Sequence, residues 1–471
     1  MRSQSTIRKR TVLWSVAQYN SNNSWLYNGN NGNVNNNNKY NNNGGRSLVY
    51  DVNEYKDLPG FRELLNEMYD AFYECRRTKR SKSSTLEFEY KLSTELISLA
   101  IGLYNFEYIP KSPIAFLIFS PRIREVIAAN FSDRVVQTWY ASKIKHLFEK
   151  DWFDYDSYSC RKGKGGLKAA QQLQKYIYEE SCGYVKDVWI VKRDIRACFM
   201  SVDTEVLERE LDEFIMQNFG LDENLRNRLL WLTRIIYRSL PQNHCIIKGN
   251  RLAWGNLEPR KSMFGKTIGI PIGNKTSQDA VLFITSMYLS KIREMGYKFC
   301  HYTDDTAIVV KDLVKWKEDE KEIERYISDV LHLEWHKDKK YVQHFSKGVE
   351  FLGYKIRYDR IFPSDRIAHN FNWKAECAIR RANDGYFGID DIESFMETFN
   401  SYTGLLKWCN AHRIKNAAMS LVSNSKLSEF FDIHGDYKIT IKKNRSRKSY
   451  FMRQNRKRKL SQKQLSKTLQ S

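Results

Sequence analysis

The sequence predicts an α+β fold of two or three domains in which one sheet carries a group of carboxylates. Three patterns lead to this prediction. An apolar, β-prone run at 188–193 ends at Asp194, residues 298–310 form two short β-prone segments around a polar turn, and residues 372–425 are helical in pattern. A chain of 471 residues with an apolar fraction of 42% can build a core of that size.

Two adjacent carboxylates, Asp304 and Asp305, stand at the tip of the predicted hairpin. Neighbouring, partly desolvated carboxylates repel each other, so the arrangement is tolerable mainly when a cation neutralises them. A solvated turn explains the pair equally well, because Asp is a common turn former. Asp194 changes this balance, since strand formation does not require a carboxylate at the end of an apolar strand, whereas metal sites often do.

Three carboxylates from one sheet suit a metal-dependent reaction. Such a set can hold two Mg²⁺ about 3.5–4 Å apart, stabilising the attacking and leaving oxygens of an in-line phosphoryl transfer. We expect Asp194 and Asp304 to be the main ligands. Asp305 is expected to be the weaker third, because neighbouring side chains tend to diverge.

The net charge of +22 and the pI near 9.4 predict a polyanionic partner, and nucleic acid is the usual one. The segment from residue 441 onward contributes 12 of these positive charges and no acidic residue, which leaves the body at +10. No long apolar span or signal peptide is expected, so no membrane partner is predicted. The eight Cys are scattered singly, which favours a reducing cytoplasm over a disulfide framework or zinc ribbon.

Basic segments recur along the chain. Predicted helices at 61–73 and 86–104 flank a basic loop, and a ribbon at 116–129 has arginines, including Arg124, on its returning strand. A second basic loop at 161–166 lacks the GxxxxGK[ST] pattern of a P-loop and is expected to contact nucleic-acid backbone at most. The expected nucleic-acid contacts are Arg76, Arg77, Lys79, Arg80, Arg134, Arg161, Lys162 and Lys164.

The remaining elements are expected in a definite order. Residues 204–240 look helical, and a polar insertion and a loop at 269–278 precede a helix at 279–292. A helix at 314–331 follows the hairpin, and a lysine-bearing segment then leads to a turn at 351–354.

In this order the chain resembles a reverse transcriptase from about residue 108 to 407. Tyr302-Thr303-Asp304-Asp305 matches the signature hairpin of that family, and Asp194-Ile195 with Phe199 matches its first catalytic strand. By resemblance, Phe199 is the steric gate that favours dNTPs, and Ile195 joins the aspartates at the metal site. The other implied positions are Arg124 and Lys111 for nucleotide binding, Lys339 as proton donor to pyrophosphate, Phe351, Leu352, Gly353 and Tyr354 as primer grip, and residues 399–406 as the start of the thumb.

The resemblance implies a right-hand polymerase, with fingers, an α+β palm whose antiparallel sheet carries the carboxylates, and a helical thumb. It implies two Mg²⁺, for which Mn²⁺ can substitute, and dNTP substrates. The expected divisions are a leader at 1–55, fingers at 56–187, a palm at 188–356 with an insertion near 215–265, a thumb at 357–435 and a basic tail at 436–471.

One departure narrows the family. Most reverse transcriptases carry Gln-Gly and then Ser-Pro in the loop under the incoming base, whereas this chain has Ile272 and Gly273 followed by Asn-Lys-Thr-Ser-Gln. That form is similar to the polymerases of diversity-generating retroelements, which misincorporate opposite template adenines. Loss of a polar contact relaxes discrimination, so Ile272 is expected to contribute to low fidelity.

The retroelement resemblance also gives the leader a second interpretation. Between residues 20 and 43, 14 of 24 positions are Asn, which by itself indicates a low-complexity segment. Residues 14–49, with their Trp and Tyr, also resemble the end of a lectin-like variable domain, as translated template-repeat sequence would. The implied partners are template-repeat RNA, the cDNA or primer, and a small oligomeric accessory variability protein, in the cytoplasm of a bacterium or phage host.

Two alternatives stay open. The chain can be a group II intron, retron or phage-defence reverse transcriptase, although no maturase or Cys/His-rich endonuclease region follows the thumb. It can also be a non-catalytic RNA-binding protein on the same scaffold, although a binding module has no use for a costly carboxylate cluster.

Overall fold

The computed structural model describes residues 54–443, apart from positions 78, 120–121 and 219. The Asn-rich leader up to residue 53 and the basic tail from residue 444 therefore lie outside the described residues.

The first described part is helical and ends in a β-ribbon. Its helices are α1 (Phe61–Arg76), α2 (Ser83–Tyr90) and α3 (Leu92–Tyr104). The prediction of one continuous helix at 86–104 is wrong. Lys91 has a non-helical backbone (φ −109°, ψ 26°) and separates α2 from α3. The predicted ribbon is confirmed as the antiparallel pair β1 (Ile114–Ile118) and β2 (Arg124–Ala128).

A short third strand, β4 (Ile246–Ile247), pairs parallel with β1. Two residues are too few for a sequence pattern, so this strand was not predicted. The segment around β4 forms short 3₁₀ helices, namely η3 (Pro241–Asn243), η4 (Arg251–Asn256) and η5 (Pro259–Lys261). Buried Glu125 on β2 holds the insertion, because its carboxylate accepts hydrogen bonds from Trp254 Nε1 (2.9 Å), Ser262 Oγ (2.6 Å) and the Met263 amide (2.8 Å).

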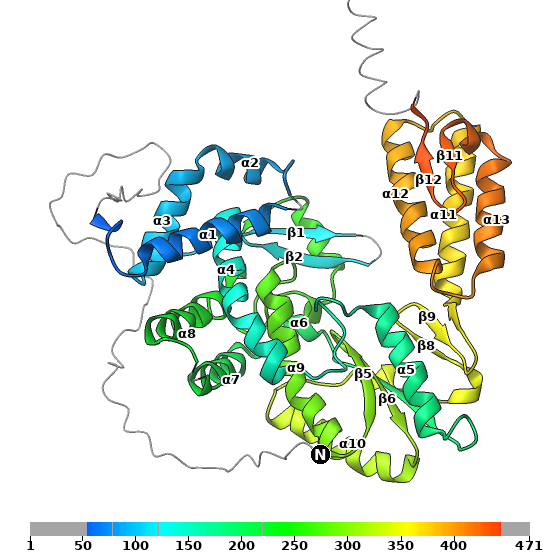
Figure 1. Ribbon diagram of the computed structural model, residues 1–471, viewed down its shortest axis with the longest axis horizontal. Helices are drawn as coiled ribbons and strands as arrows, with labels where there is room; N and C mark the ends of the chain where they lie inside the picture. The colour runs from blue at the N-terminus through cyan, green and yellow to red at the C-terminus, as the bar shows by residue number, and fades with distance from the viewer. Residues whose placement is uncertain (1–53, 78, 120–121, 219, 444–471) are drawn as a thin grey trace, which may run out of the picture. The chain divides into compact units, whose positions relative to one another are not determined.

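The central sheet has the strand order β5-β6-β3-β7, and every neighbouring pair is antiparallel. Figure 1 labels its strands β5 and β6. Its strands are β3 (Trp189–Asp194), β5 (Lys298–Tyr302), β6 (Asp305–Val310) and β7 (Tyr341–His344). The strand that ends at Asp194 thus lies between the predicted hairpin and β7. One sheet does carry all three predicted carboxylates.

Helices cover both faces of this sheet, because successive residues of a strand point to opposite faces and β6 is apolar and buried without interruption from Ala307 to Val310. On one face α5 (Gly166–Glu180) packs against Ile190, Cys300 and Ala307. On the other face α9 (Lys275–Glu294) contributes Tyr288, whose hydroxyl lies 3.0 Å from Thr306 Oγ1. The further helices of this region are α4 (Phe131–Leu147), the π-helix η2 (Phe148–Trp152), α6 (Cys198–Ser201), α7 (Thr204–Gln217), α8 (Glu223–Tyr237) and α10 (Leu313–Asp329).

A second sheet has the order β10-β9-β8, from β8 (Val349–Phe351), β9 (Tyr354–Ile356) and β10 (Ile361–Pro363). An expected domain boundary at 357 passes through this sheet, because β10 pairs with β9. Residues flanking β7 form the short turns η6 (Lys337–Lys339) and η7 (Phe345–Lys347).

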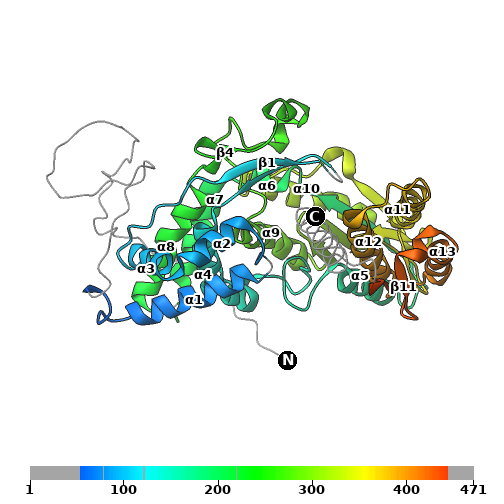
Figure 2. The ribbon, with the colours of Figure 1, turned by 90° about the horizontal axis from the view of Figure 1, so that it is seen from above.

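The predicted C-terminal helices are present as α11 (Asp365–Asn383), α12 (Ile389–Leu406) and α13 (His412–Ser423) (Figure 2). They enclose an apolar core that includes Phe371, Phe399 and Val422. The turn η8 (Lys426–Glu429) and the hairpin of β11 (Phe431–Ile433) and β12 (Ile439–Ile441) complete it. The expected start of the basic tail at residue 436 is therefore too early, because Ile439 is buried in this core.

Among the described residues, no helix combines the length and the apolarity that crossing a membrane requires.

Candidate active site

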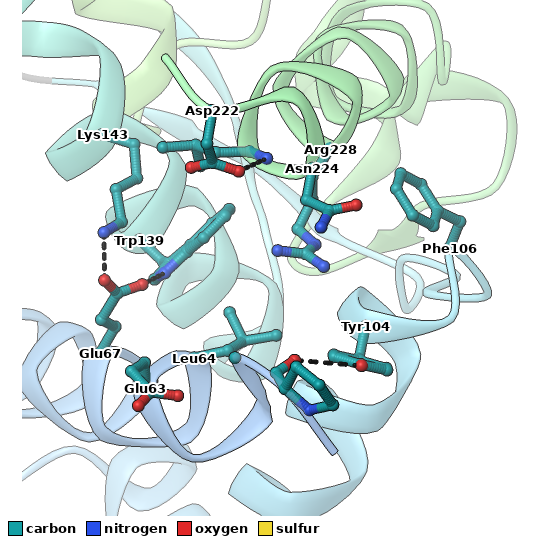
Figure 3. Close-up of a pocket in the computed structure, with 13 residues that line it drawn as sticks. Glu63, Leu64, Glu67, Tyr104, Phe106, Trp139, Lys143, Asp222, Asn224 and Arg228 are labelled. Carbon is teal, nitrogen blue, oxygen red and sulfur yellow. Dashed lines mark hydrogen bonds and ion pairs between the residues drawn. The ribbon is translucent and has the colours of Figure 1, made fainter. Parts of the chain in front are cut away.

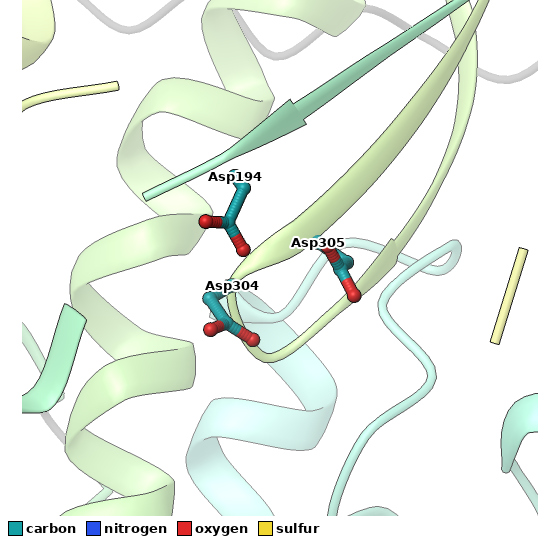
Figure 4. A group of neighbouring side chains, drawn as sticks. All are labelled: Asp194, Asp304 and Asp305. Atoms are coloured by element: carbon teal, nitrogen blue, oxygen red, sulfur yellow. The ribbon is translucent and has the colours of Figure 1, made fainter. Parts of the chain in front are cut away.

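Three carboxylates meet where β3 ends and the β5–β6 hairpin turns (Figure 4). Asp194 is the last residue of β3 and lies opposite Asp305 in the β3–β6 register. Oxygen atoms of Asp194, Asp304 and Asp305 all lie within 4.8 Å of one another. The expected divergence of Asp305 does not exclude it from this group, because its strand position places it across from Asp194.

A strained turn presents Asp304. The hairpin closes on the Tyr302–Asp305 pair, so Thr303 and Asp304 alone form the turn. Thr303 adopts a left-handed backbone (φ 60°), which is uncommon for a β-branched residue and is retained where surrounding contacts enforce it. One such contact joins the turn to the neighbouring strand, because the Ile195 amide donates to the Asp304 carbonyl at 3.2 Å.

The electrostatics of the three carboxylates favour a bound cation. Burial, followed by repulsion from Asp305 and Asp194, raises the pKa of Asp304 to about 7. Burial and then the Asp194 charge raise the pKa of Asp305 as well. Three oxygen-donor side chains, of which Asp304 and Asp305 have raised pKa values, match the hard-oxygen preference of Mg²⁺, so the residues present fit the expected metal.

Two lysines approach the carboxylates. Lys339 on η6 forms an ion pair with Asp194. It therefore lies beside the carboxylates, where a proton donor to pyrophosphate would have to be. Lys192 on β3 lies near Asp305, and burial lowers the pKa of its ammonium group. Lys192 was not predicted, although its position two residues before Asp194 on the same strand was a usable signal.

The loop that carries Ile272 and Gly273 packs against the ribbon. Gly273 has φ +113°, which strains any residue with a side chain, and a Cβ at this position would lie only 3.0 Å from Val126 Cγ1. Ile272 packs beside a small apolar cluster that includes Met200 on α6. The preceding Ile270 amide donates to the Phe199 carbonyl at 2.8 Å, which joins this loop to the backbone of Phe199.

The two predicted nucleotide-binding cations differ in their surroundings. Arg124 begins β2 and is exposed, without an ion-pair partner among the described residues. Lys111 is instead engaged, because its ammonium group pairs with Glu95 at 3.2 Å and its amide donates to buried Asp133 at 3.1 Å.

The predicted primer-grip residues form the tight turn between β8 and β9, in which Phe351 pairs with Tyr354. Leu352 (φ 52°) and Gly353 (φ 85°) both have positive φ, as a two-residue hairpin turn demands. Leu352 packs 3.6 Å from the Cβ position of Gly166, at the start of α5. This contact places the turn beside the predicted basic loop at 161–166.

Four of the predicted nucleic-acid contacts have internal hydrogen-bond partners. Arg76 makes two bonds to Glu89 (2.6 and 2.9 Å), and Arg134 Nε donates to the Ala129 carbonyl at 2.9 Å. Arg161 is 6% exposed and bonds Glu149 together with two carbonyls, and Lys164 donates to the Tyr155 carbonyl. The guanidinium groups of Arg76 and Arg161 therefore hold other parts of the chain, and their contact with nucleic acid stays a prediction. Arg77, Arg80 and Lys162 are exposed, and Lys79 is half-buried.

A separate pocket lies between α1, α4 and α8, and Lys143, Trp139 and Glu67 stand on one side of it (Figure 3). The Glu67 carboxylate accepts a hydrogen bond from Trp139 Nε1 at 2.9 Å and pairs with the Lys143 ammonium group. These contacts join α1 to α4. None of the predicted site residues lines this pocket, so it is not part of the carboxylate site.

Sequence reasoning missed the segment at 154–160, which runs along the outer edge of β5. The Tyr158 amide donates to the His301 carbonyl (2.8 Å), and the His301 amide donates to the Asp156 carbonyl (2.9 Å). Buried Ser159 Oγ accepts from the Thr303 amide at 2.9 Å, at the strained turn. No local pattern signals a bond between residues 144 positions apart.

Ser159→Ala is expected to lower the turnover rate of DNA synthesis by about 10-fold, because the unpaired Thr303 amide loosens the turn that presents Asp304. The KM for dNTP should stay within about twofold. Steady-state primer extension measures both parameters. Ser142→Ala, which removes a hydroxyl bonded only within α4, serves as the control. A fall in melting temperature with unchanged turnover would limit Ser159 to a structural role.

Residues 109–356 match the reverse transcriptase (RNA-dependent DNA polymerase) family. No curated protein matches the chain. Among solved structures, apo telomerase from Candida tropicalis, truncated from the C-terminal domain, is similar at 10% identity and TM-score 0.41, over 54% of this chain and 55% of that one. Telomerase from Candida albicans, in complex with a TWJ fragment of telomeric RNA, is similar at 12% identity and TM-score 0.39, over 69% and 63%.

The chain spans about 55% to 63% of the length of these two telomerases, and similarity at this level carries no argument about activity. The family match covers more than half of the chain and includes all three carboxylates. The fold is that of a right-hand polymerase, with the carboxylates on its antiparallel sheet. The chain belongs to the reverse transcriptase (RNA-dependent DNA polymerase) family.

Proposed function

We propose that the protein is an RNA-directed DNA polymerase of the diversity-generating type, which makes adenine-mutagenic cDNA from a template-repeat RNA. The observation that carries the polymerase activity is the meeting of Asp194, Asp304 and Asp305 within 4.8 Å on two neighbouring strands. A structural fold does not require such a group, since burial and then like charges raise the pKa values of Asp304 and Asp305.

We divide the described chain into fingers, palm and thumb by its secondary-structure elements. The fingers comprise α1 to α5, the β1–β2 ribbon, and the insertion near 215–265. The palm is the central sheet with α6, α9, α10 and the β8–β10 sheet. The thumb is the helical unit from α11 to β12, whose separate apolar core supports its treatment as a domain.

In the palm, Asp194, Asp304 and Asp305, together with the Ile195 backbone, would hold Mg²⁺. The bound metal ions would neutralise charge on the attacking and leaving oxygens. Exposed Arg124 binds the triphosphate, because a planar guanidinium pairs with phosphate oxygens in a bidentate manner. Phe199 excludes a ribose 2′-OH, and Lys339, beside Asp194, protonates the pyrophosphate leaving group.

Primer extension tests the polymerase proposal. Purified full-length protein, an RNA template with an annealed DNA primer, four dNTPs and Mg²⁺ are expected to give DNA that ends at the template 5′ end. Chelation of the metal should stop synthesis. A protein that binds the template–primer but never extends it would be the RNA-binding alternative instead.

Ile272 supports the mutagenic assignment. Its side chain has no amide group that could bond the incoming nucleotide or the template, and it packs on an apolar cluster that includes Met200. Ile272→Gln is expected to lower errors opposite template adenine by about 3- to 10-fold, because a restored polar contact sharpens discrimination. Sequencing of cDNA from an adenine-containing RNA measures this, with Ile272→Leu as the apolar control. An unchanged error rate in Ile272→Gln would remove this residue from the mechanism.

The retroelement assignment also names partners, namely template-repeat RNA and a small oligomeric accessory protein. Flanking DNA distinguishes this type from group II intron, retron and phage-defence enzymes. A near-copy of the coding sequence for residues 14–49 in a second gene, differing only at adenines, is the expected finding. Flanking DNA without a template and variable repeat pair would favour the other types.

A further inference from the structure

The four-residue helix α6 carries Phe199 and ends against the loop that leads to Ile272. Two amides of this loop bond to the end of the helix. The Ile270 amide donates to the Phe199 carbonyl at 2.8 Å. The Gly269 amide donates to the Val202 carbonyl, also at 2.8 Å. The last carbonyls of a helix have no partners within it, so the loop that supplies their donors fixes where the Phe199 backbone lies.

Gly269 lies in close contact with the backbone of α6. It is buried and has φ +100°. A Cβ at this position would lie 3.1 Å from the carbonyl oxygen of Met200, 3.2 Å from its Cα and 3.3 Å from its carbonyl carbon. Backbone atoms cannot rotate away as the end of a long side chain can. The missing side chain of residue 269 is therefore what permits the loop and the helix to approach so closely.

The packing around this contact has little room to adjust. Met200 is buried in an apolar cluster that joins α6 to the β1–β2 ribbon, and Ile272 packs against the same cluster. Closely packed side chains transmit a displacement instead of absorbing it. A side chain at residue 269 would therefore push α6, which carries Phe199, away from the loop that carries Ile272.

We infer that Gly269 is a positioning residue for ribose discrimination, because it lets the loop hold α6 where the Phe199 ring excludes a 2′-OH. This inference rests on the proposed function, in which Phe199 excludes ribonucleotides. Separation of α6 from the loop widens the space between Phe199 and Ile272. One methylene or hydroxyl group in a pocket changes discrimination by about 10- to 200-fold, so a small displacement is enough to admit a ribonucleotide.

Single-nucleotide incorporation opposite template guanine tests this inference. The measured quantity is the ratio of kcat/KM for dCTP to kcat/KM for CTP, with both values from one preparation of the full-length protein. The fraction of folded protein cancels in this ratio, so a merely structural role does not change it. Gly269→Ala is expected to lower the ratio by about 10-fold, because CTP is incorporated more efficiently. A wild-type ratio in this variant would overturn the inference.

Gly265→Ala is the matched control. Gly265 also has a positive φ (+75°), but a Cβ there would have no neighbouring atom within 4 Å among the described residues. The control therefore introduces backbone strain without pushing on α6, and it should keep the wild-type ratio. Equal falls in the Gly265→Ala and Gly269→Ala variants would assign the effect to strain and contradict the inference.

A double variant determines whether Gly269 acts through the ring of Phe199. Phe199→Ala removes the ring and should lower the ratio by itself. Addition of Gly269→Ala should then change the ratio by less than about twofold, because the group that it displaces is absent. A further fall as large as that in the wild-type background would mean that Gly269 acts elsewhere.

Met200→Ala provides a second test should Gly269→Ala yield no folded protein. It loosens the same contact from the side of α6, without strain at residue 269, and is expected to lower the ratio by about threefold. An unchanged ratio would then overturn the inference. Wild-type protein that never extends a primer would remove the proposed function as well, whereas wild-type protein that prefers dCTP, with the same preference in Gly269→Ala, contradicts the role of Gly269 alone.

Discussion

Asp304→Asn is expected to reduce RNA-templated primer extension at least about 10³-fold, because it removes one of the three carboxylates that would hold the catalytic metal ions. Affinity for the template–primer in EDTA should stay within about threefold, since the substitution leaves the basic surface intact. Single-turnover extension and anisotropy measure the two quantities. Asp187→Asn, an exposed residue just before β3, is the control. A variant that still extends primers at the wild-type rate would place the chemistry elsewhere.

The same variant should be more stable than the wild type in the absence of metal. Burial and two neighbouring carboxylates raise the folded-state pKa of Asp304 from 3.8 to about 7. Protonated Asp304 therefore favours the fold below about pH 4, and this contribution is lost as the pH rises towards 7. At about pH 8, the Asp304→Asn variant avoids a buried charge, and the gain is about 2–4 kcal/mol. Thermal melting in EDTA at about pH 5 and about pH 8 should show a clearly larger difference between the two proteins at the higher pH, and Mg²⁺ should reduce it.

Glu320→Ala is expected to destabilise the protein by about 3–5 kcal/mol, because it leaves a buried cation without its partner. Glu320 on α10 is 4% exposed and bonds Arg193 of β3 through Nε (2.8 Å) and the terminal guanidinium (2.6 Å). Lys340 pairs with the same carboxylate, and Arg193 stacks over Trp335 at 4.8 Å. This network ties α10 and the segment after it to the strand that ends at Asp194.

Urea denaturation followed by tryptophan fluorescence measures the loss. Glu322→Ala, on the exposed side of the same helix, should stay within about 0.5 kcal/mol of the wild type. Equal stabilities of the Glu320→Ala and Glu322→Ala variants would contradict this prediction. Arg193 would then have found another partner or been reached by water.

The parts of the fold with strong local patterns were predictable. The hairpin, the strand ending at Asp194, the ribbon and the C-terminal helices each have an apolar period or a turn that the sequence displays. The Asp304–Asp305 pair and Asp194 could be assigned to one site for two reasons. Antiparallel pairing of their strands brings them together, and the order of motifs along the chain resembles that of a known family.

The rest depended on contacts between distant segments. Ser159 at the Thr303 amide and Glu125 at the insertion are single polar residues that have no local signature. Basic loops could be recognised as charged, but the sequence does not show that Arg161 is enclosed by Glu149 and two carbonyls while Lys162 beside it is exposed.

The central claim is that Asp194 and the hairpin form one metal site for DNA synthesis, and iron-directed cleavage tests it most directly. Fe²⁺ binds oxygen ligands like those of Mg²⁺, and with ascorbate and peroxide it cuts the nearby backbone. Wild-type protein should be cut both near residue 194 and near residues 303–305, with Mg²⁺ competing and Asp304→Asn abolishing both cuts. Cleavage at only one of these segments, or at neither, would contradict a shared site.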